Sequence, residues 1–382
     1  MTLLQYKLEV VKNTRNTLNI TLTNASKYPV RFLRWNTPFD SLEANIFDVK
    51  MFDGEIVDYI GKRAKRQILY QESTLYIDSK SSLSINVNIG RFYNFKAIAV
   101  HIVRISSLRL HFTEVTNRNE KVTEDTLKIA ETSCNTVEIE IYPEDNLYDE
   151  HPLSSEIPSI PIEGKPIAFE YDETHTPTPI CPPIFLCMRP AYHIGGECYN
   201  RRYISYPEVI GTNEETKNSL KRLYLKLIKT YIMHRGEWIP DRWDFHTCPI
   251  YKKWFGSYNK YLALHVAKTL SAITSYRGCM PYSIIVDNFC TKNKDTVAYF
   301  RKSNDPTRVD VLGICSLFFR LNETGLNSKP GTIGHELSHG YGNTEDHGYG
   351  INECIILAKN EPEKAIENAD SYQYYLEEKK PF

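Results

Sequence analysis

Two histidines four positions apart, with a glutamate directly after the first, constrain this chain more than any other feature. They stand in the glycine-rich stretch 331–350, GTIGHELSHGYGNTEDHGYG. If residues 332–339 are helical, His335 and His339 are related by about 40° of rotation, so both imidazoles leave the same helix face. Glu336 then lies about 100° from His335, within reach of a water on a metal ion without being a ligand. This H-E-x-x-H spacing predicts a metal-binding helix.

The third metal ligand has to come from the residues after His339, because a catalytic zinc ion has three protein ligands and one open position. A metzincin site, which needs a methionine turn beneath the metal, is excluded, since no methionine follows Met280. One open alternative is a glutamate on a second helix, for which the candidates are Glu353, Glu361 and Glu363. The other is Asp346, on a turn that the glycines and asparagine of 340–343 leave free to fold back.

The complete pattern resembles the signature of the aspzincins, the family of deuterolysin and peptidyl-Lys metalloendopeptidase. That signature is G-T-x-x-H-E-x-x-H followed by T-x-D-x-x-Y-G, and residues 331–339 and 344–350 fill every position of it. The resemblance continues in an aromatic W-F-G segment at 251–258, in a hairpin-like region at 290–319 and in the N-A-D triplet 368–370. It therefore covers most of the C-terminal half.

The resemblance implies a zinc-dependent endopeptidase with one zinc ion per chain. His335, His339 and Asp346 would be the metal ligands, and Glu336 would be the general base. Tyr349 would donate a hydrogen bond to the oxyanion. Zinc in such an open site lowers the pKa of its water to about 7 and polarises the carbonyl of the bond to be cleaved.

The resemblance also implies a disulfide and a specificity pocket. Cys290 would pair with Cys315. Asp370 matches one of two acidic residues that line the pocket for the residue after the cleaved bond in the peptidyl-Lys branch, and the neutral Gln373 stands at the second position. We therefore expect at most a moderate preference for lysine on the carboxyl side of the cleaved bond.

The N-terminal part, residues 1–142, has short alternating apolar runs separated by turn residues, which predict an antiparallel β-sandwich. The segment 28–47 together with Arg63–Arg66 resembles the pro-domain of secreted aspzincins. A proline-rich stretch at 143–190 predicts a linker, because proline cannot donate to a strand ladder. If the front domain is removed, we expect the cleavage within 143–200.

The C-terminal part, residues 191–382, changes to a helical period. A stripe of apolar residues at 220–231 and a second helix at 258–276 are expected, followed by a small sheet within 282–320. The metal helix comes next, and helices over 350–359 and 362–378 pack behind it. The prediction is an α+β, mainly helical zincin-type domain.

The composition of the chain limits its possible partners and its location. Among 382 residues, 46 basic side chains meet 47 acidic ones, a net charge of −1 that argues against nucleic acid as a partner. Protein or peptide substrates, no membrane contact and a monomer are expected. Nine cysteines point to secretion, although residues 1–19 lack the apolar block of a signal peptide. The alternative is a degenerate zincin whose β domain is a binding or toxin-like module.

Overall fold

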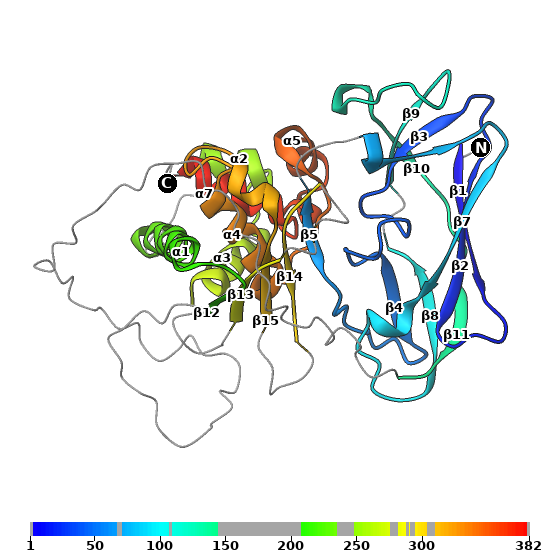
Figure 1. Cartoon of the computed structure of the whole chain (residues 1–382), viewed down its shortest axis with the longest axis horizontal. Coiled ribbons are helices and arrows are strands. Elements are labelled where there is room, and N and C mark those ends of the chain that lie inside the picture. Colours follow the sequence, from blue (N-terminus) through cyan, green and yellow to red (C-terminus); the bar gives the residue numbers. More distant parts are fainter. Residues whose placement is uncertain are drawn as a thin grey trace, which may run out of the picture.

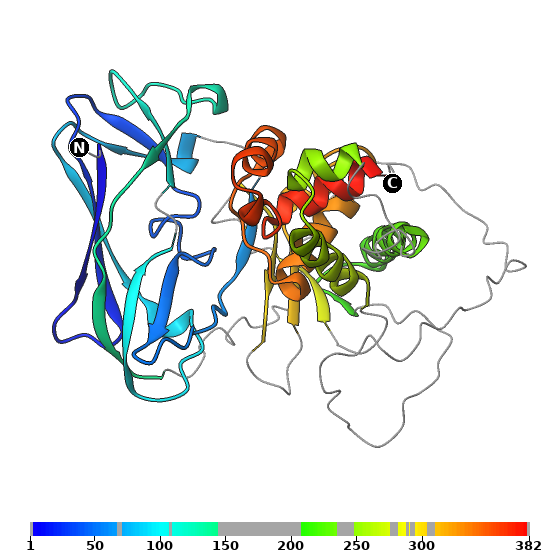
Figure 2. The ribbon, with the colours of Figure 1, turned by 180° about the vertical axis from the view of Figure 1, so that it is seen from behind.

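An N-terminal β region and a C-terminal α/β region lie side by side in the computed structural model (Figures 1 and 2). The structure describes residues 3–66, 71–106, 109–143, 208–234, 248–275, 282–287, 290, 295–303 and 310–379. The predicted linker 143–190 lies outside these residues except for Pro143, so it stays a prediction. Within the described residues, no helix has both the length and the apolar character that crossing a bilayer requires.

The N-terminal region is built from antiparallel strands around one apolar core, which confirms the all-β prediction. Alternation decides which face is buried: in the second strand Leu18, Ile20 and Leu22 point to the core while the residues between them are partly exposed. The strands, in sheet order, are β1 (Leu4–Val10), β2 (Thr17–Asn24) and β7 (Ser82–Asn88); β10 (Lys128–Glu131), β9 (Arg109–Glu114), β3 (Val30–Leu33) and β6 (Thr74–Ile77); and β11 (Val137–Ile141), β8 (Ala99–Ile105) and β4 (Phe47–Met51). Their arrangement as a two-layer sandwich stays a prediction.

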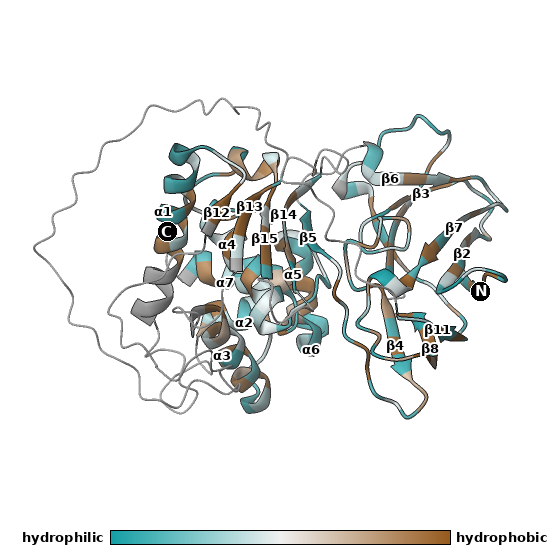
Figure 3. Cartoon of the chain, turned by 60° about the horizontal axis from the view of Figure 1, so that its bottom comes forward, coloured by the Kyte–Doolittle hydropathy of each residue, from teal (hydrophilic) through white to brown (hydrophobic). Residues whose placement is uncertain are grey.

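The C-terminal region contains a mixed sheet whose order is β12-β13-β15-β14-β5. Its strands are β12 (Glu208–Ile210), β13 (Tyr282–Val286), β15 (Asp310–Ile314), β14 (Thr296–Arg301) and β5 (Arg63–Arg66). The central strands are apolar, as Figure 3 shows by their brown colour, because both faces of the sheet are covered. The sheet predicted within 282–320 is thus present. The region is α/β, and its description as mainly helical is not confirmed.

Helices cover this sheet, and they carry the histidines predicted to bind a metal. They are α1 (Glu214–His234), α2 (Pro249–Phe255), α3 (Lys260–Ser275), α4 (Lys329–Leu337), the π-helical turn η9 (Ser338–Gly342), α5 (Gly350–Asn360), α6 (Pro362–Ala365) and α7 (Ala369–Lys379). The predicted stripe on the first helix is buried at Leu220, Leu223 and Leu227. Trp254 of α2 stacks on Tyr374 of α7, with ring centroids 5.0 Å apart.

The prediction of a single helix over 362–378 is wrong. It breaks between α6 and α7, where Glu345 exchanges backbone hydrogen bonds with Glu367 and Ala369. Asn368 in the break is fully buried, and its side-chain oxygen accepts hydrogen bonds from the backbone N–H groups of His347 and Gly348. The helix is interrupted because these groups of the loop after the histidines need partners.

Strand β5 links the two regions. It belongs in sequence to the N-terminal part, yet it pairs antiparallel with β14 and forms the edge of the C-terminal sheet (Figure 1). All four residues of the strand are buried, although three of them are arginine or lysine. Alternation of apolar residues could not reveal such a strand, because its cations are buried by pairing with acids of both regions.

Candidate metal centre

The packing of α4 on α7 positions the first histidine. Ser328 caps α4, accepting a hydrogen bond from the backbone N–H of Gly331 at 3.1 Å, and Pro330 occupies the first turn. A Cβ added to Gly331 would collide with the carboxylate of Glu377 on α7. The glycine of the signature therefore permits the close approach of these two helices.

The second histidine lies on a π-helical turn. The α-helical hydrogen bonding ends at Leu337, two residues earlier than predicted, and η9 carries His339. The rings of His335 and His339 still approach each other, edge to face, with 3.1 Å between their Nε2 atoms. Single π turns inside helices are frequent at functional sites. The turn ends at Asn343, whose φ of 55° is left-handed, so the chain folds back as the sequence predicts.

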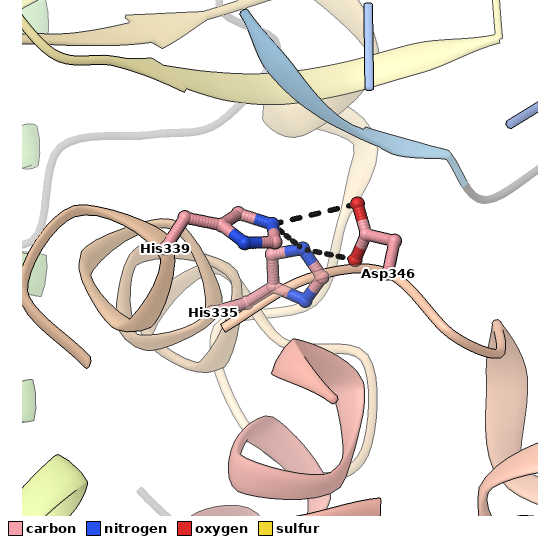
Figure 4. Close-up of side chains that lie close together, drawn as sticks. All are labelled: His335, His339 and Asp346. Carbon is pink, nitrogen blue, oxygen red and sulfur yellow. Dashed lines mark hydrogen bonds and ion pairs between the residues drawn. The ribbon is translucent and has the colours of Figure 1, made fainter. Parts of the chain in front are cut away.

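The returning chain brings a carboxylate to both imidazoles. Oδ1 of Asp346 lies 3.3 Å from Nε2 of His335, and Oδ2 lies 3.4 Å from Nε2 of His339 (Figure 4). One ligating atom from each of the three residues can be chosen so that all lie within 4.8 Å of one another. The three side chains are at most 2% exposed. Two imidazole nitrogens and one carboxylate form a donor set typical of catalytic zinc.

The alternative carboxylates do not belong to this group of ligating atoms. Glu353 accepts a hydrogen bond from the backbone N–H of Tyr349 and contacts His111 of the N-terminal region. Glu361 pairs with Arg109 and Lys364. Glu363 is exposed. The structure therefore brings Asp346 to the histidines, and not the glutamates of the following helices.

Each histidine has an oxygen atom close to its other ring nitrogen. Nδ1 of His339 lies 2.8 Å from the carbonyl oxygen of Thr344, and Nδ1 of His335 lies 2.8 Å from Oδ1 of Asp370. Partners of this kind hold the ring and direct the Nε2 lone pair to a metal. The sequence predicts no separate role for Thr344 and only a substrate-binding role for Asp370. The signature threonine was the available signal, but its backbone carbonyl makes the contact.

Burial and neighbouring charges set the protonation of the cluster. Burial, assisted by the charge of Lys65, lowers the pKa of His335 to about 4, so its imidazole is neutral at pH 7. Burial alone would raise the pKa of Asp346, but the nearby His339 and His335 hold it below its usual range. Burial would lower the pKa of His339, but the charges of Asp346 and Glu336 raise it, so binding of a metal has to displace a proton from this ring.

Glu336 is fully buried, and neither of its carboxylate oxygens has a hydrogen-bond partner among the described residues. Burial raises its pKa to about 8, and the charges of His339 and Asp346 also act on it. A buried carboxylate without a partner is costly. Its presence beside the three ligating atoms fits a site for a metal ion and a water molecule.

Tyr349 lies at the same centre. Its hydroxyl is 3.1 Å from Oδ2 of Asp346 and 3.2 Å from two N-terminal acceptors, the carbonyl oxygen of Ala64 and Oδ1 of Asn36. The ring of Trp35 packs edge-on against it, with centroids 5.7 Å apart. These N-terminal contacts were not predicted, because nothing in the sequence connects positions about three hundred residues apart.

The two predicted pocket residues differ in their surroundings. Asp370 is buried between His335 and Lys65, and its Oδ1 lies 2.5 Å from the Lys65 Nζ. Gln373, one turn later on α7, is also buried, and its amide donates to Oε1 of Glu377 at 3.0 Å.

The predicted disulfide between Cys290 and Cys315 is present, with 5.6 Å between the Cα atoms. It joins the segment after β13 to the end of β15.

Comparison with known proteins places this geometry in a class. Residues 246–377 match the profile of a family described as lysine-specific metallo-endopeptidase, the aspzincins. A peptidyl-Lys metalloendopeptidase of Pleurotus ostreatus is 32% identical over 129 residues, which are 33% of this chain and 72% of that protein. The corresponding protein of Grifola frondosa is 34% identical over 131 residues, 34% of this chain and 35% of its own length.

Two further likenesses extend over different parts of the chain. An extracellular protease of Aeromonas hydrophila is 23% identical over 362 residues, covering 94% of this chain and 87% of that protein. A solved structure titled zinc peptidase from Grifola frondosa matches with a TM-score of 0.36 and 23% identity, covering 44% of this chain and 97% of the other.

The relatives and the site define a metalloendopeptidase. Within this class, the chain belongs to the aspzincin family.

Proposed function

We propose that the protein is a zinc endopeptidase in which His335, His339 and Asp346 hold one zinc ion. The convergence of these three ligating atoms within 4.8 Å, next to the unpartnered Glu336, is the observation that carries the proposal. Zinc held there with an open position would supply a Lewis acid that polarises the peptide carbonyl, and it would lower the pKa of water so that the water loses a proton near pH 7. Glu336 would accept that proton and pass it to the leaving amine.

The other residues of the site orient and stabilise. Asp370 and Thr344 hold the rings of His335 and His339 through their Nδ1 atoms. The hydroxyl of Tyr349 would donate a hydrogen bond to the developing oxyanion, and its distance of 3.1 Å from a carboxylate oxygen of Asp346 supports this role.

The zinc assignment is tested by metal content measured together with hydrolysis. We expect one zinc ion per purified chain by plasma emission spectroscopy. For the activity assay, trypsin first cuts the chain within residues 143–200 and is then blocked with an inhibitor. The cut chain, called the nicked chain below, is expected to cleave casein. Treatment with a chelator should remove both the zinc and the activity, and added zinc should restore them. A chain that takes up no zinc and cleaves no casein would instead support the degenerate zincin.

We further propose a moderate preference for lysine on the carboxyl side of the cleaved bond. Asp370 provides a buried negative charge, and buried Glu377, seven residues later on α7, lies close enough for its charge to act on the Lys65 ammonium. The fungal relatives carry lysine specificity in their names, and this chain shares about a third of its residues with them over the matched segment.

A digest of a peptide library checks this preference. Lysine should be enriched directly after the cleaved bonds. In the Asp370→Asn variant this enrichment should fall at least about tenfold, because the ammonium of the substrate lysine would be buried without its partner. Zinc content measured on the same samples separates a lost pocket charge from a lost metal. If the wild-type digest shows no enrichment of lysine or arginine, Asp370 only positions His335.

We also propose that the N-terminal β region is a pro-domain and that the protein is secreted. The full-length likeness to an extracellular protease, the disulfide and the extensive contact of the N-terminal region with the site support this reading.

A further inference from the structure

Strand β5 adds an extended segment to the edge of the sheet beside the metal centre. Arg63–Arg66 pairs antiparallel with β14, with Ala64 opposite Tyr299 and Lys65 opposite Ala298. Addition of a strand to an open sheet edge is a general mode of peptide recognition, in which backbone hydrogen bonds hold the peptide and alternate side chains enter pockets. The segment comes from the N-terminal region, so the chain here recognises part of itself.

Lys65 enters the pocket that the proposed function assigns to a substrate lysine. Its side chain is 1% exposed, and its Nζ lies 2.5 Å from Oδ1 of Asp370. The charges of Asp346 and Glu377 act on the same ammonium. Lysine is almost never fully buried unless it is paired. The pocket is therefore complementary to a lysine side chain, and a lysine of this chain fills it.

The peptide bond before Lys65 lies at the groups proposed to act on a substrate. The carbonyl oxygen of Ala64 is 3.2 Å from the hydroxyl of Tyr349, which in turn is 3.1 Å from Oδ2 of Asp346. In a substrate with lysine on the carboxyl side, the carbonyl to be attacked belongs to the residue preceding that lysine. Ala64 and Lys65 have this register.

The two arginines of β5 clamp the strand on either side of this bond. Arg63 pairs with Glu345 at 3.0 Å, directly before the proposed ligand Asp346. Arg66 is buried between Asp295 of the C-terminal region and Asp40 of the N-terminal region, at 2.9 and 2.7 Å. Buried, multiply paired arginines of this kind hold a segment more firmly than exposed ion pairs do.

We infer that Arg63–Arg66 occupies the substrate site as an intramolecular substrate analogue, with the Ala64–Lys65 bond in the place of the bond to be cleaved. The inference rests on the proposed function and adds its regulation. While β5 is seated, a lysine-containing peptide can neither reach Asp370 nor pair with β14. The tethered strand competes at a high effective concentration, so an outside peptide binds weakly to the intact chain.

Peptide binding to the full chain without turnover tests this inference. The zinc-loaded Glu336→Gln chain is titrated with a short fluorescent peptide that has one internal lysine, and fluorescence anisotropy gives the dissociation constant. Adding Lys65→Ala should tighten binding at least about tenfold, since the pocket charge is freed for the outside lysine. The affinity of a matched peptide with norleucine in place of lysine should increase much less. As a control, Lys7→Ala is added instead of Lys65→Ala. It removes an exposed lysine of β1 and should leave the dissociation constant of the lysine peptide unchanged.

Lys65→Met serves as a second variant, because it keeps most of the side-chain volume while removing the charge, and circular dichroism checks that each chain is folded. Equal affinity of the parent and both Lys65 variants for the lysine peptide overturns the inference. Failure of the proposed function is distinguishable: it appears as absence of zinc from the wild-type chain, and zinc content does not depend on whether Lys65 occupies the site.

Discussion

Glu336→Gln is expected to reduce peptide hydrolysis by about 10²–10⁴-fold while leaving the bound zinc in place. The amide has nearly the shape of the carboxylate, so the fully buried site can keep its packing. It cannot accept a proton, however, and Glu336 is the carboxylate of the centre that has no hydrogen-bond partner among the described residues. The measurement is kcat/KM on a fluorogenic peptide with the nicked enzyme, together with zinc content by plasma emission.

Glu323→Gln is the matched control for this substitution. Glu323 lies in the same region but is 39% exposed, pairing with Arg222 and Lys226. Such surface pairs contribute little, about 0–1 kcal/mol, so this variant should retain wild-type kinetics. If the Glu336→Gln enzyme cleaves casein as fast as wild type, Glu336 is not the base and the proposed mechanism is wrong.

Asp346→Asn is expected to weaken zinc binding by more than about 100-fold, because even residues that only orient ligands change metal affinity by 10–100-fold. The substitution removes the negative charge from a site in which Asp346 is within 3.4 Å of both Nε2 atoms. Hydrolysis should fall with the zinc occupancy. Competition with a chromogenic chelator gives the affinity, and activity at saturating zinc separates lost binding from lost chemistry.

Glu353→Gln distinguishes the two possible origins of the third ligand. Glu353 is the first glutamate of the following helix, and its carboxylate contacts the backbone N–H of Tyr349 and the imidazole ring of His111. Zinc affinity close to wild type is therefore expected for this variant. Loss of zinc in Glu353→Gln with retention in Asp346→Asn would contradict the assignment of Asp346.

Part of the centre follows from short-range pattern. Residues four apart on a helix share a face whatever the rest of the chain does, so the spacing of His335 and His339 predicts their approach, and the π turn preserved it. The bend after His339 was predictable from its glycines and Asn343. That the bend delivers Asp346 required the resemblance to a family, because the glutamates of α5 and α6 were equally possible from pattern alone.

Other features depend on contacts between distant residues. The orientation of His335 by Asp370 joins α4 to α7, and the break at Asn368 exists because the loop after the histidines needs its side-chain oxygen. Helical periodicity over 362–378 contains no information about that need. Propensity and pattern describe a residue's neighbours along the chain, whereas these contacts belong to packing.

The amino-acid sequence by itself determined the all-β character of the first part, the helix with its two histidines and the membership in a metallopeptidase family. Only the tertiary structure decided that Arg63–Arg66 leaves the N-terminal region and places Lys65 against Asp370. The reason is physical. A stretch of three cations and an alanine resembles a solvated turn until acids neutralise it, most of them more than two hundred residues away, and such pairing exists only once the chain has folded.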